Sequence, residues 1–81
     1  MSVVTVYVLQ GADKRYVGIT KNVARRFAEH RSGSHSGRLI GDFAVLHTET
    51  FPDYASARVR ERFLKSGRGR EWLRERYPKC R

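Results

Sequence analysis

The sequence is poor in cysteine and in acidic residues and has no long apolar run. One cysteine, Cys80, cannot form an internal disulfide, which excludes a disulfide-stabilised secreted domain. No apolar run approaches the roughly 20 residues of a membrane-spanning helix, and residues 1–5 lack the charged and apolar regions of a signal peptide. We therefore expect a cytoplasmic protein without a membrane partner.

Because acidic residues are few, the chain is strongly basic. Eight Asp and Glu stand against 17 Lys and Arg, for a formal net charge of +9, and arginine outnumbers lysine thirteen to four. Guanidinium groups bind phosphate through paired hydrogen bonds, so this excess favours nucleic acid as the partner. A basic surface that serves only solubility is the alternative. The 81 residues are expected to form one domain over residues 1–81.

Alternating β-branched and aromatic residues predict strands, and apolar residues at helical spacing predict helices. The strands are expected at Val3–Leu9, Arg15–Ile19 and Phe43–Phe51, and the helices at Val23–Arg31, Tyr54–Ser66 and Glu71–Tyr77. Residues 11–13 predict a turn, Asn22 a helix cap and residues 32–37 a surface loop. Gly67 and Gly69 are expected to end the second helix.

The order strand, strand, helix, strand, helix, helix predicts the class α+β. Three strands are too few for a doubly wound sheet, and the opening hairpin makes the sheet antiparallel from its start. We expect a three-stranded antiparallel sheet flanked by helices.

The first predicted helix carries two polar residues on its apolar face. At about 100° per residue, Arg26 and His30 share an arc with Val23 and Phe27, whereas Arg25 and Glu29 lie on the opposite side. A buried guanidinium must be paired or face an anion, so an acidic group is expected near Arg26. The alternative is an arginine reaching solvent from the rim and a hydrogen-bonded core histidine.

Glu61 is the only acid in the second predicted helix, and cations surround it. Two apolar stripes are expected on this helix, Ala57 with Leu64 and Val59 with Phe63. Glu61 lies beside the first stripe. A carboxylate in this setting either forms ion pairs at i,i+4 spacing or holds a divalent cation against a phosphate, and the helix pattern leaves both open.

Two short motifs, Thr5-Val6-Tyr7 and Tyr16-Val17-Gly18, resemble the paired strands that name the GIY-YIG nuclease family. Arg26, ten residues past Tyr16, stands where the family carries an arginine. Ala57, Glu61 and Lys65 are similar to the family's alanine, glutamate and lysine pattern. The resemblance covers nearly the whole chain and points to the short stand-alone members.

The chain departs from the family pattern at two places. Thr5 stands in place of the leading glycine of the first motif, which affects strand packing. The asparagine that many members carry after the metal-binding glutamate has no clear counterpart, which bears on how the substrate is positioned.

The resemblance implies a metal-dependent endonuclease that hydrolyses phosphodiester bonds in DNA, structure-selective or weakly sequence-specific, with a role in DNA repair or recombination. Glu61 is then the ligand of one Mg²⁺ or Mn²⁺, and Arg26 holds the scissile phosphate. Tyr7 and Tyr16 are then expected on neighbouring strands, with both hydroxyls on one open face. Tyr7 or Tyr16 accepts a proton if nearby cations favour phenolate, and His30 orients a tyrosine or helps to move the proton. Ordinary strand packing is the alternative for both tyrosines.

The last third of the chain is basic enough to bind the DNA backbone apart from catalysis. Residues 58–81 hold ten Lys and Arg against three acids. The predicted phosphate contacts are Arg25, Lys65, Arg68 and Arg70. Two other functions need only this surface: a catalytically silent nucleic-acid-binding module, and a small basic protein that docks on an RNA–protein assembly.

Overall fold

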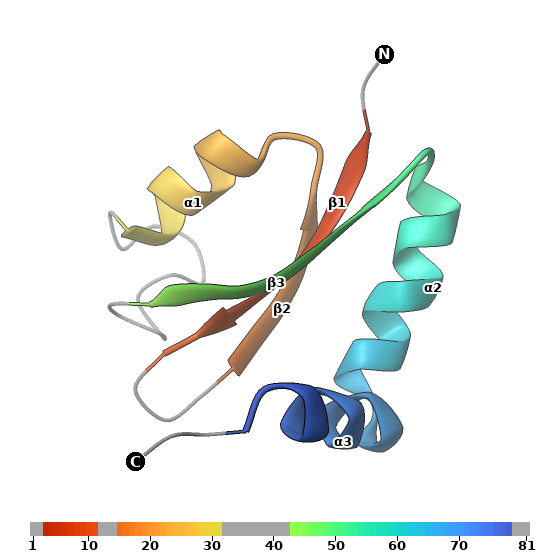
Figure 1. Ribbon diagram of the computed structural model, residues 1–81. Coiled ribbons are helices and arrows are strands. Elements are labelled where there is room, and N and C mark those ends of the chain that lie inside the picture. The colour runs from red at the N-terminus through yellow and green to blue at the C-terminus, as the bar shows by residue number, and fades with distance from the viewer. Residues whose placement is uncertain (1–2, 12–14, 32–42, 79–81) are drawn as a thin grey trace.

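The computed structural model describes residues 3–11, 15–31 and 43–78, without the side chains of residues 30 and 31. It contains strands β1 (Val4–Gln10), β2 (Arg15–Thr20) and β3 (Ala44–Phe51) and helices α1 (Val23–Arg31), α2 (Tyr54–Lys65) and α3 (Gly67–Arg76) (Figure 1). The predicted order is confirmed, and the first five elements match their expected bounds to within one residue. The predicted loop at 32–37, the last two residues of the predicted turn at 11–13 and Cys80 lie outside the described residues.

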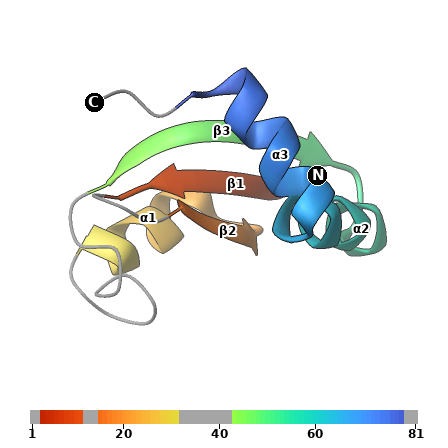
Figure 2. The ribbon, with the colours of Figure 1, turned by 90° about the horizontal axis from the view of Figure 1, so that it is seen from below.

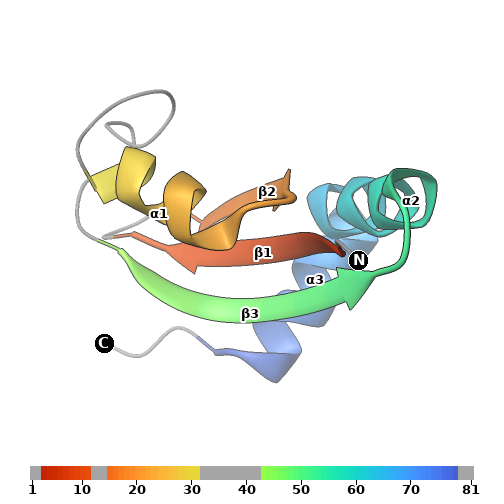
Figure 3. The same cartoon turned by 90° about the horizontal axis from the view of Figure 1, so that it is seen from above.

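β1 is the central strand of the sheet. The strand order is β2-β1-β3, and both pairs are antiparallel, which confirms the predicted α+β class. α1 lies on one face of the sheet and α3 on the opposite face, while α2 stands beside the end at which β1 begins (Figures 2 and 3). Helices on both faces leave little of β1 in contact with solvent.

The apolar core lies between the sheet and the last two helices. Its buried members are Val4, Val6, Val8, Val17, Ala57, Leu64 and Leu73. The alternate residues of β1 face α1, and the whole stretch from Val4 to Leu9 is buried. A central strand covered on both faces therefore appears in the sequence as one continuous apolar run.

α2 is the longest helix, with 12 residues, and it turns one edge to the sheet. Ala57 and Leu64 on that edge are buried as predicted. The second predicted stripe was wrong for Val59, which is 70% exposed, because Val59 lies well around the helix from the buried edge. In the described part of the chain, no helix combines the length and the apolar character needed to cross a membrane.

α3 begins at Gly67, four residues earlier than predicted. Ser66 ends α2 and also caps α3, since its Oγ accepts a hydrogen bond from the Gly69 amide at 3.2 Å. Gly69 packs so closely on α2 that a Cβ there would overlap the Phe63 carbonyl and the Leu64 backbone. The two glycines therefore belong to a tight corner between helices, and the expectation of a break before Glu71 was wrong.

Candidate active site

Tyr7 and Tyr16 lie on adjacent strands and on the same face of the sheet, as predicted. The register pairs Tyr7 with Gly18 and Tyr16 with Leu9, so the tyrosines are diagonal neighbours with ring centroids 6.2 Å apart. A Cβ at position 18 would overlap the Tyr7 hydroxyl and stand 3.0 Å from Cε2 of Tyr16. The glycine of the second motif thus lets Tyr7 reach across β2.

Tyr7 has no exposed surface, so the expectation of an open face was wrong for this residue. Phe27 of α1 covers it, with the two rings edge to face at 5.2 Å. Burial raises the pKa of Tyr7 well above its ordinary range, and Tyr16 and Glu61 add to the rise, while the charge and hydrogen bond of Arg26 oppose it. The Tyr7 phenol is therefore neutral in this state and able to donate a hydrogen bond.

α1 separates Arg26 from Arg25 as the helix pattern predicts. Asn22 caps the helix, because its Oδ1 accepts a hydrogen bond from the Arg25 amide at 3.0 Å. The Arg26 side chain is 25% exposed and that of Arg25 is 70% exposed. An acid does lie near Arg26, but it is Glu29, which the helix pattern put on the side of Arg25. Its Oε1 lies 3.4 Å from Arg26 Nε and its Oε2 lies 3.7 Å from Arg25 Nε. The side chain of His30 lies outside the described residues.

Glu61, on α2, lies near Tyr7. Its side chain is 15% exposed, and Oε2 lies 3.1 Å from Lys65 Nζ, so the expected i,i+4 ion pair is present. The charge of Glu61 also acts on the pKa of Tyr7. Tyr7 is therefore the common neighbour of Tyr16, Arg26 and Glu61, which come from three further elements.

A divalent cation at Glu61 would have fewer than three His, Cys, Asp or Glu ligands from the described residues. Within residues 3–11, 15–31 and 43–78, no three His, Cys, Asp or Glu side chains gather closely enough to hold a metal. Mg²⁺ commonly keeps several waters and is held by one or two carboxylates together with substrate phosphates. This donor set fits a cation held jointly with a DNA phosphate, and Lys65 would have to move from Glu61 for the cation to bind.

The predicted phosphate contacts are distributed over three helices. Arg25 lies on α1, Lys65 on α2, and Arg68 and Arg70 on α3, and all four are exposed. Because α1 and α3 cover opposite faces, the sheet separates Arg25 from the α3 pair (Figure 2). Of the four, Lys65 forms an ion pair with a predicted catalytic residue, Glu61.

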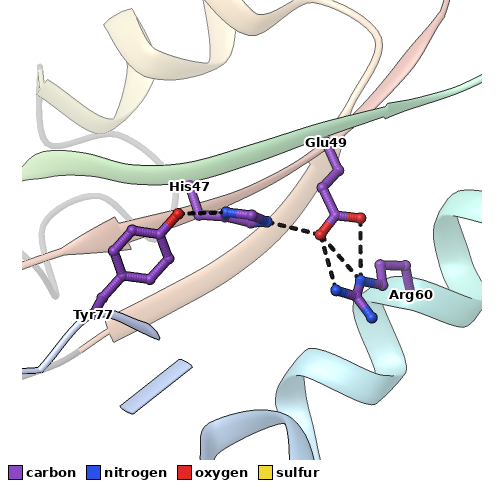
Figure 4. Close-up of polar contacts among 4 residues, drawn as sticks. All are labelled: His47, Glu49, Arg60 and Tyr77. Carbon is purple, nitrogen blue, oxygen red and sulfur yellow. Dashed lines mark hydrogen bonds and ion pairs between the residues drawn. The ribbon is translucent and has the colours of Figure 1, made fainter. Parts of the chain in front are cut away.

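A second polar cluster, missed by the sequence analysis, lies on the opposite face of the sheet. His47 and Glu49 pair with Val8 and Val6, so they point away from Tyr7. His47 Nδ1 lies 2.8 Å from the Tyr77 hydroxyl and Nε2 lies 2.7 Å from Glu49 Oε2, while Arg60 Nε donates to both Glu49 oxygens at 3.1 Å (Figure 4). The signal available in the sequence was a His and a Glu at alternate positions of one strand.

This cluster joins β3 to α2 and α3. Burial alone would raise the pKa of Glu49, but the hydrogen bonds from His47 and Arg60 and the two charges hold it below its ordinary value. The Trp72 ring lies between Arg60 and Arg76, whose Cζ atoms are 4.8 and 5.2 Å from its centroid. The contacts anchor the last helix to the sheet, which is a structural role.

Comparison with known proteins supports the resemblance of the motifs. The model of the family described as GIY-YIG catalytic domain matches residues 4–75. A UPF0213 protein of Natronomonas pharaonis is 44% identical over 64 residues, which are 75% of each chain. A UPF0213 protein of Desulfotalea psychrophila is 38% identical over 64 residues, 74% of this chain and 58% of that protein. The solution NMR structure of a UPF0213 protein from Bacillus halodurans is similar with a TM-score of 0.58 and 32% identity, over 93% of this chain and 85% of that one.

Proposed function

Because the chain belongs to the GIY-YIG catalytic domain family, a nuclease-type family, we propose that it is a metal-dependent endonuclease acting on DNA. The observation that carries the proposal is the position of Tyr7, which lies with its ring centroid 6.2 Å from that of Tyr16, hydrogen bonds with Arg26 and is near the charge of Glu61. Phosphodiester hydrolysis needs an activated water, neutralised charge on the phosphate and a stabilised leaving oxygen, and a guanidinium, a metal-binding carboxylate and two phenols can supply these.

Arg26 binds the scissile phosphate in this proposal. Its guanidinium donates two hydrogen bonds in a plane that matches two phosphate oxygens, and it stabilises the charge that grows on them. Its partly buried place beside Tyr7 keeps the contact away from bulk water and therefore strengthens it.

The two tyrosines have different environments and are assigned different roles. Tyr7 is buried and its pKa is raised, so it donates a hydrogen bond to the phosphate or to the attacking water. Tyr16 is only partly buried, which makes it the better placed of the two to relay a proton: it accepts the proton of the attacking water and gives its own to solvent. His30, one turn beyond Arg26, remains the proposed residue for orienting a tyrosine.

Glu61 is the proposed ligand of one Mg²⁺ or Mn²⁺. When bound, the cation lowers the pKa of its waters and neutralises charge on the leaving oxygen. Lys65, which is exposed, moves from Glu61 to a phosphate oxygen in this arrangement.

We further propose that the enzyme is selective for DNA structure, with at most weak sequence specificity. Its role would be in DNA repair or recombination, and its location would be the cytoplasm. Arg25, Arg68 and Arg70 are exposed cations suited to phosphates, and phosphate contacts carry no direct sequence information.

A catalytically silent nucleic-acid-binding module is the second candidate. The ion pair between Glu61 and Lys65 favours it, because a carboxylate that keeps its lysine has less charge available for a metal. The basic surface would bind DNA equally well in either case.

Incubation with branched, single-stranded and duplex DNA in Mg²⁺, Mn²⁺ or EDTA distinguishes the two. The endonuclease cuts at least one DNA in the presence of metal and none in EDTA. Salt-sensitive binding without cleavage in either metal supports the silent module, and cleavage that survives EDTA contradicts the proposed chemistry.

A further inference from the structure

We propose that Tyr54, with Lys21 and Arg58, forms a stacking site for an unpaired base of the DNA near the scissile phosphate. This inference rests on the proposed function, because it names the substrate class of the same site. The preferred DNA then carries single-stranded nucleotides next to the bond that is cut.

Tyr54 is a large aromatic side chain that remains outside the core. It begins α2 and is 45% exposed. Lys21 Nζ lies 5.5 Å and Arg58 Cζ lies 6.0 Å from the centroid of its ring. Both cations lie over the ring, so a base that stacks on Tyr54 displaces one of these exposed side chains, which then binds a phosphate of the same strand. An aromatic ring with cations beside it is the combination with which proteins bind single strands.

The two cations keep their charge available for DNA. Neither Lys21 nor Arg58 forms an ion pair with a carboxylate of the described residues. Asp53, the acid next to Tyr54 in sequence, caps α2 by accepting a hydrogen bond from the Ser56 amide at 2.8 Å. The aromatic site therefore presents net positive charge beside an accessible ring.

The stacking site and Glu61 lie on one stripe of α2. At about 100° per residue, Tyr54, Arg58, Glu61 and Lys65 fall within about 60° of arc. The contact of Arg58 with Tyr54 and the ion pair of Lys65 with Glu61 agree with this placement. From Tyr54 to Glu61 is seven residues, roughly 10 Å along the axis, which is about three steps of a stacked strand at ~3.4 Å per nucleotide.

A base that stacks on Tyr54 must be unpaired. The faces of bases in a duplex are covered by their neighbours, so the ring of Tyr54 can stack only on a base that has left the stack. A strand whose phosphate lies at Arg26 and Glu61 would place such a base at Tyr54 within a few nucleotides.

Binding of fluorescein-labelled single-stranded dT20 and of a 20-base-pair duplex, both in EDTA, tests the proposal. Tyr54→Ala should bind dT20 about tenfold more weakly than wild type and should bind the duplex equally well. Tyr54→Phe, which keeps the ring, should bind dT20 as wild type does. Val59→Ala removes an exposed apolar side chain from another side of the same helix and should change neither affinity.

Equal affinity of wild type and Tyr54→Ala for dT20 would overturn the stacking site. Equal losses for dT20 and duplex would also overturn it, because Tyr54 would then support the surface as a whole. Binding in EDTA does not need cleavage, so a protein that shows the expected pattern but cuts no DNA contradicts only the proposed endonuclease.

Discussion

The hydroxyl of Tyr7 lies over the backbone of Gly18 on the neighbouring strand, with no room for a Cβ between them. Residue 18 is therefore a glycine because another side chain occupies the space above it. Because residue 18 has no side chain, Tyr7 can extend over β2, where it lies next to Tyr16 and near the charge of Glu61 on α2. Fold and proposed site depend on each other at this point.

Gly18→Ala should destabilise the protein by about 1–3 kcal/mol, since the methyl group forces Tyr7 from its place in a packed interior. Urea denaturation measures the change. Gly67→Ala is the matched control, because a Cβ at position 67 meets nothing within 4 Å and alanine favours a helix over glycine by up to ~1 kcal/mol. Equal stability of the two variants would show that the Tyr7–Gly18 contact is not tight.

The pattern of apolar residues was sufficient to predict the fold. Each strand alternates or is continuously apolar, each of the first two helices has a capping residue, and the hairpin determines the antiparallel pairing. The start of α3 was not predictable from propensity, since two glycines within four residues normally end a helix. Packing of Gly69 against Phe63 and Leu64 reverses that preference.

The sequence predicted on which face of a helix or strand the proposed site residues lie, but it did not predict how deeply Tyr7 is buried. Helix periodicity placed Arg26 inward and Arg25 outward, and the family resemblance placed both tyrosines on neighbouring strands with their hydroxyls on one face. The burial of Tyr7 depends on how α1 lies over the sheet, which local pattern does not determine. The His47–Glu49 cluster was missed because its partners come from helices more than ten residues away in sequence.

Glu61→Gln should lower the cleavage rate by more than about 100-fold while the fold and the DNA affinity stay as in wild type. The amide keeps the volume of the side chain but lacks the charge that retains the metal. Single-turnover cleavage in Mg²⁺ and salt-dependent DNA binding measure the two quantities. Glu61→Ala should also keep binding, and its complete loss would mean that Glu61 is structural.

Arg26→Lys should lower cleavage on the order of 100-fold although the charge is kept, because an ammonium cannot donate two parallel hydrogen bonds to a phosphate. Arg25→Lys, on the exposed side of the same helix, should cleave nearly as fast as wild type. The rates are compared in Mg²⁺ at saturating DNA. Equal activity of the two variants would remove Arg26 from the proposed centre.

Lys65→Met should strengthen Mn²⁺ binding by the protein alone about twofold. The ion pair of Lys65 with Glu61 competes with the metal, and pairs of this kind are worth about 0.3–0.5 kcal/mol. Isothermal titration with Mn²⁺ in the absence of DNA measures the affinity. Arg62→Met removes an exposed cation from the same helix without breaking the pair, so a gain of the same size in both variants would point to net charge instead.

Glu49→Gln should lower the free energy of unfolding by roughly 1–3 kcal/mol at pH 7, because it weakens charged hydrogen bonds from His47 and Arg60. The folded pKa of Glu49 lies below its ordinary value of 4.5, so the stabilisation is complete above about that pH and is lost as the pH falls through the folded value. The difference between wild type and variant should therefore be constant near neutrality and shrink on acidification, as urea denaturation from about pH 7 to about pH 3 would measure. Glu75→Gln, at an exposed position of α3, should show no such difference. A wild-type advantage that persists undiminished at about pH 3 would mean that Glu49 acts through packing and not through its charge.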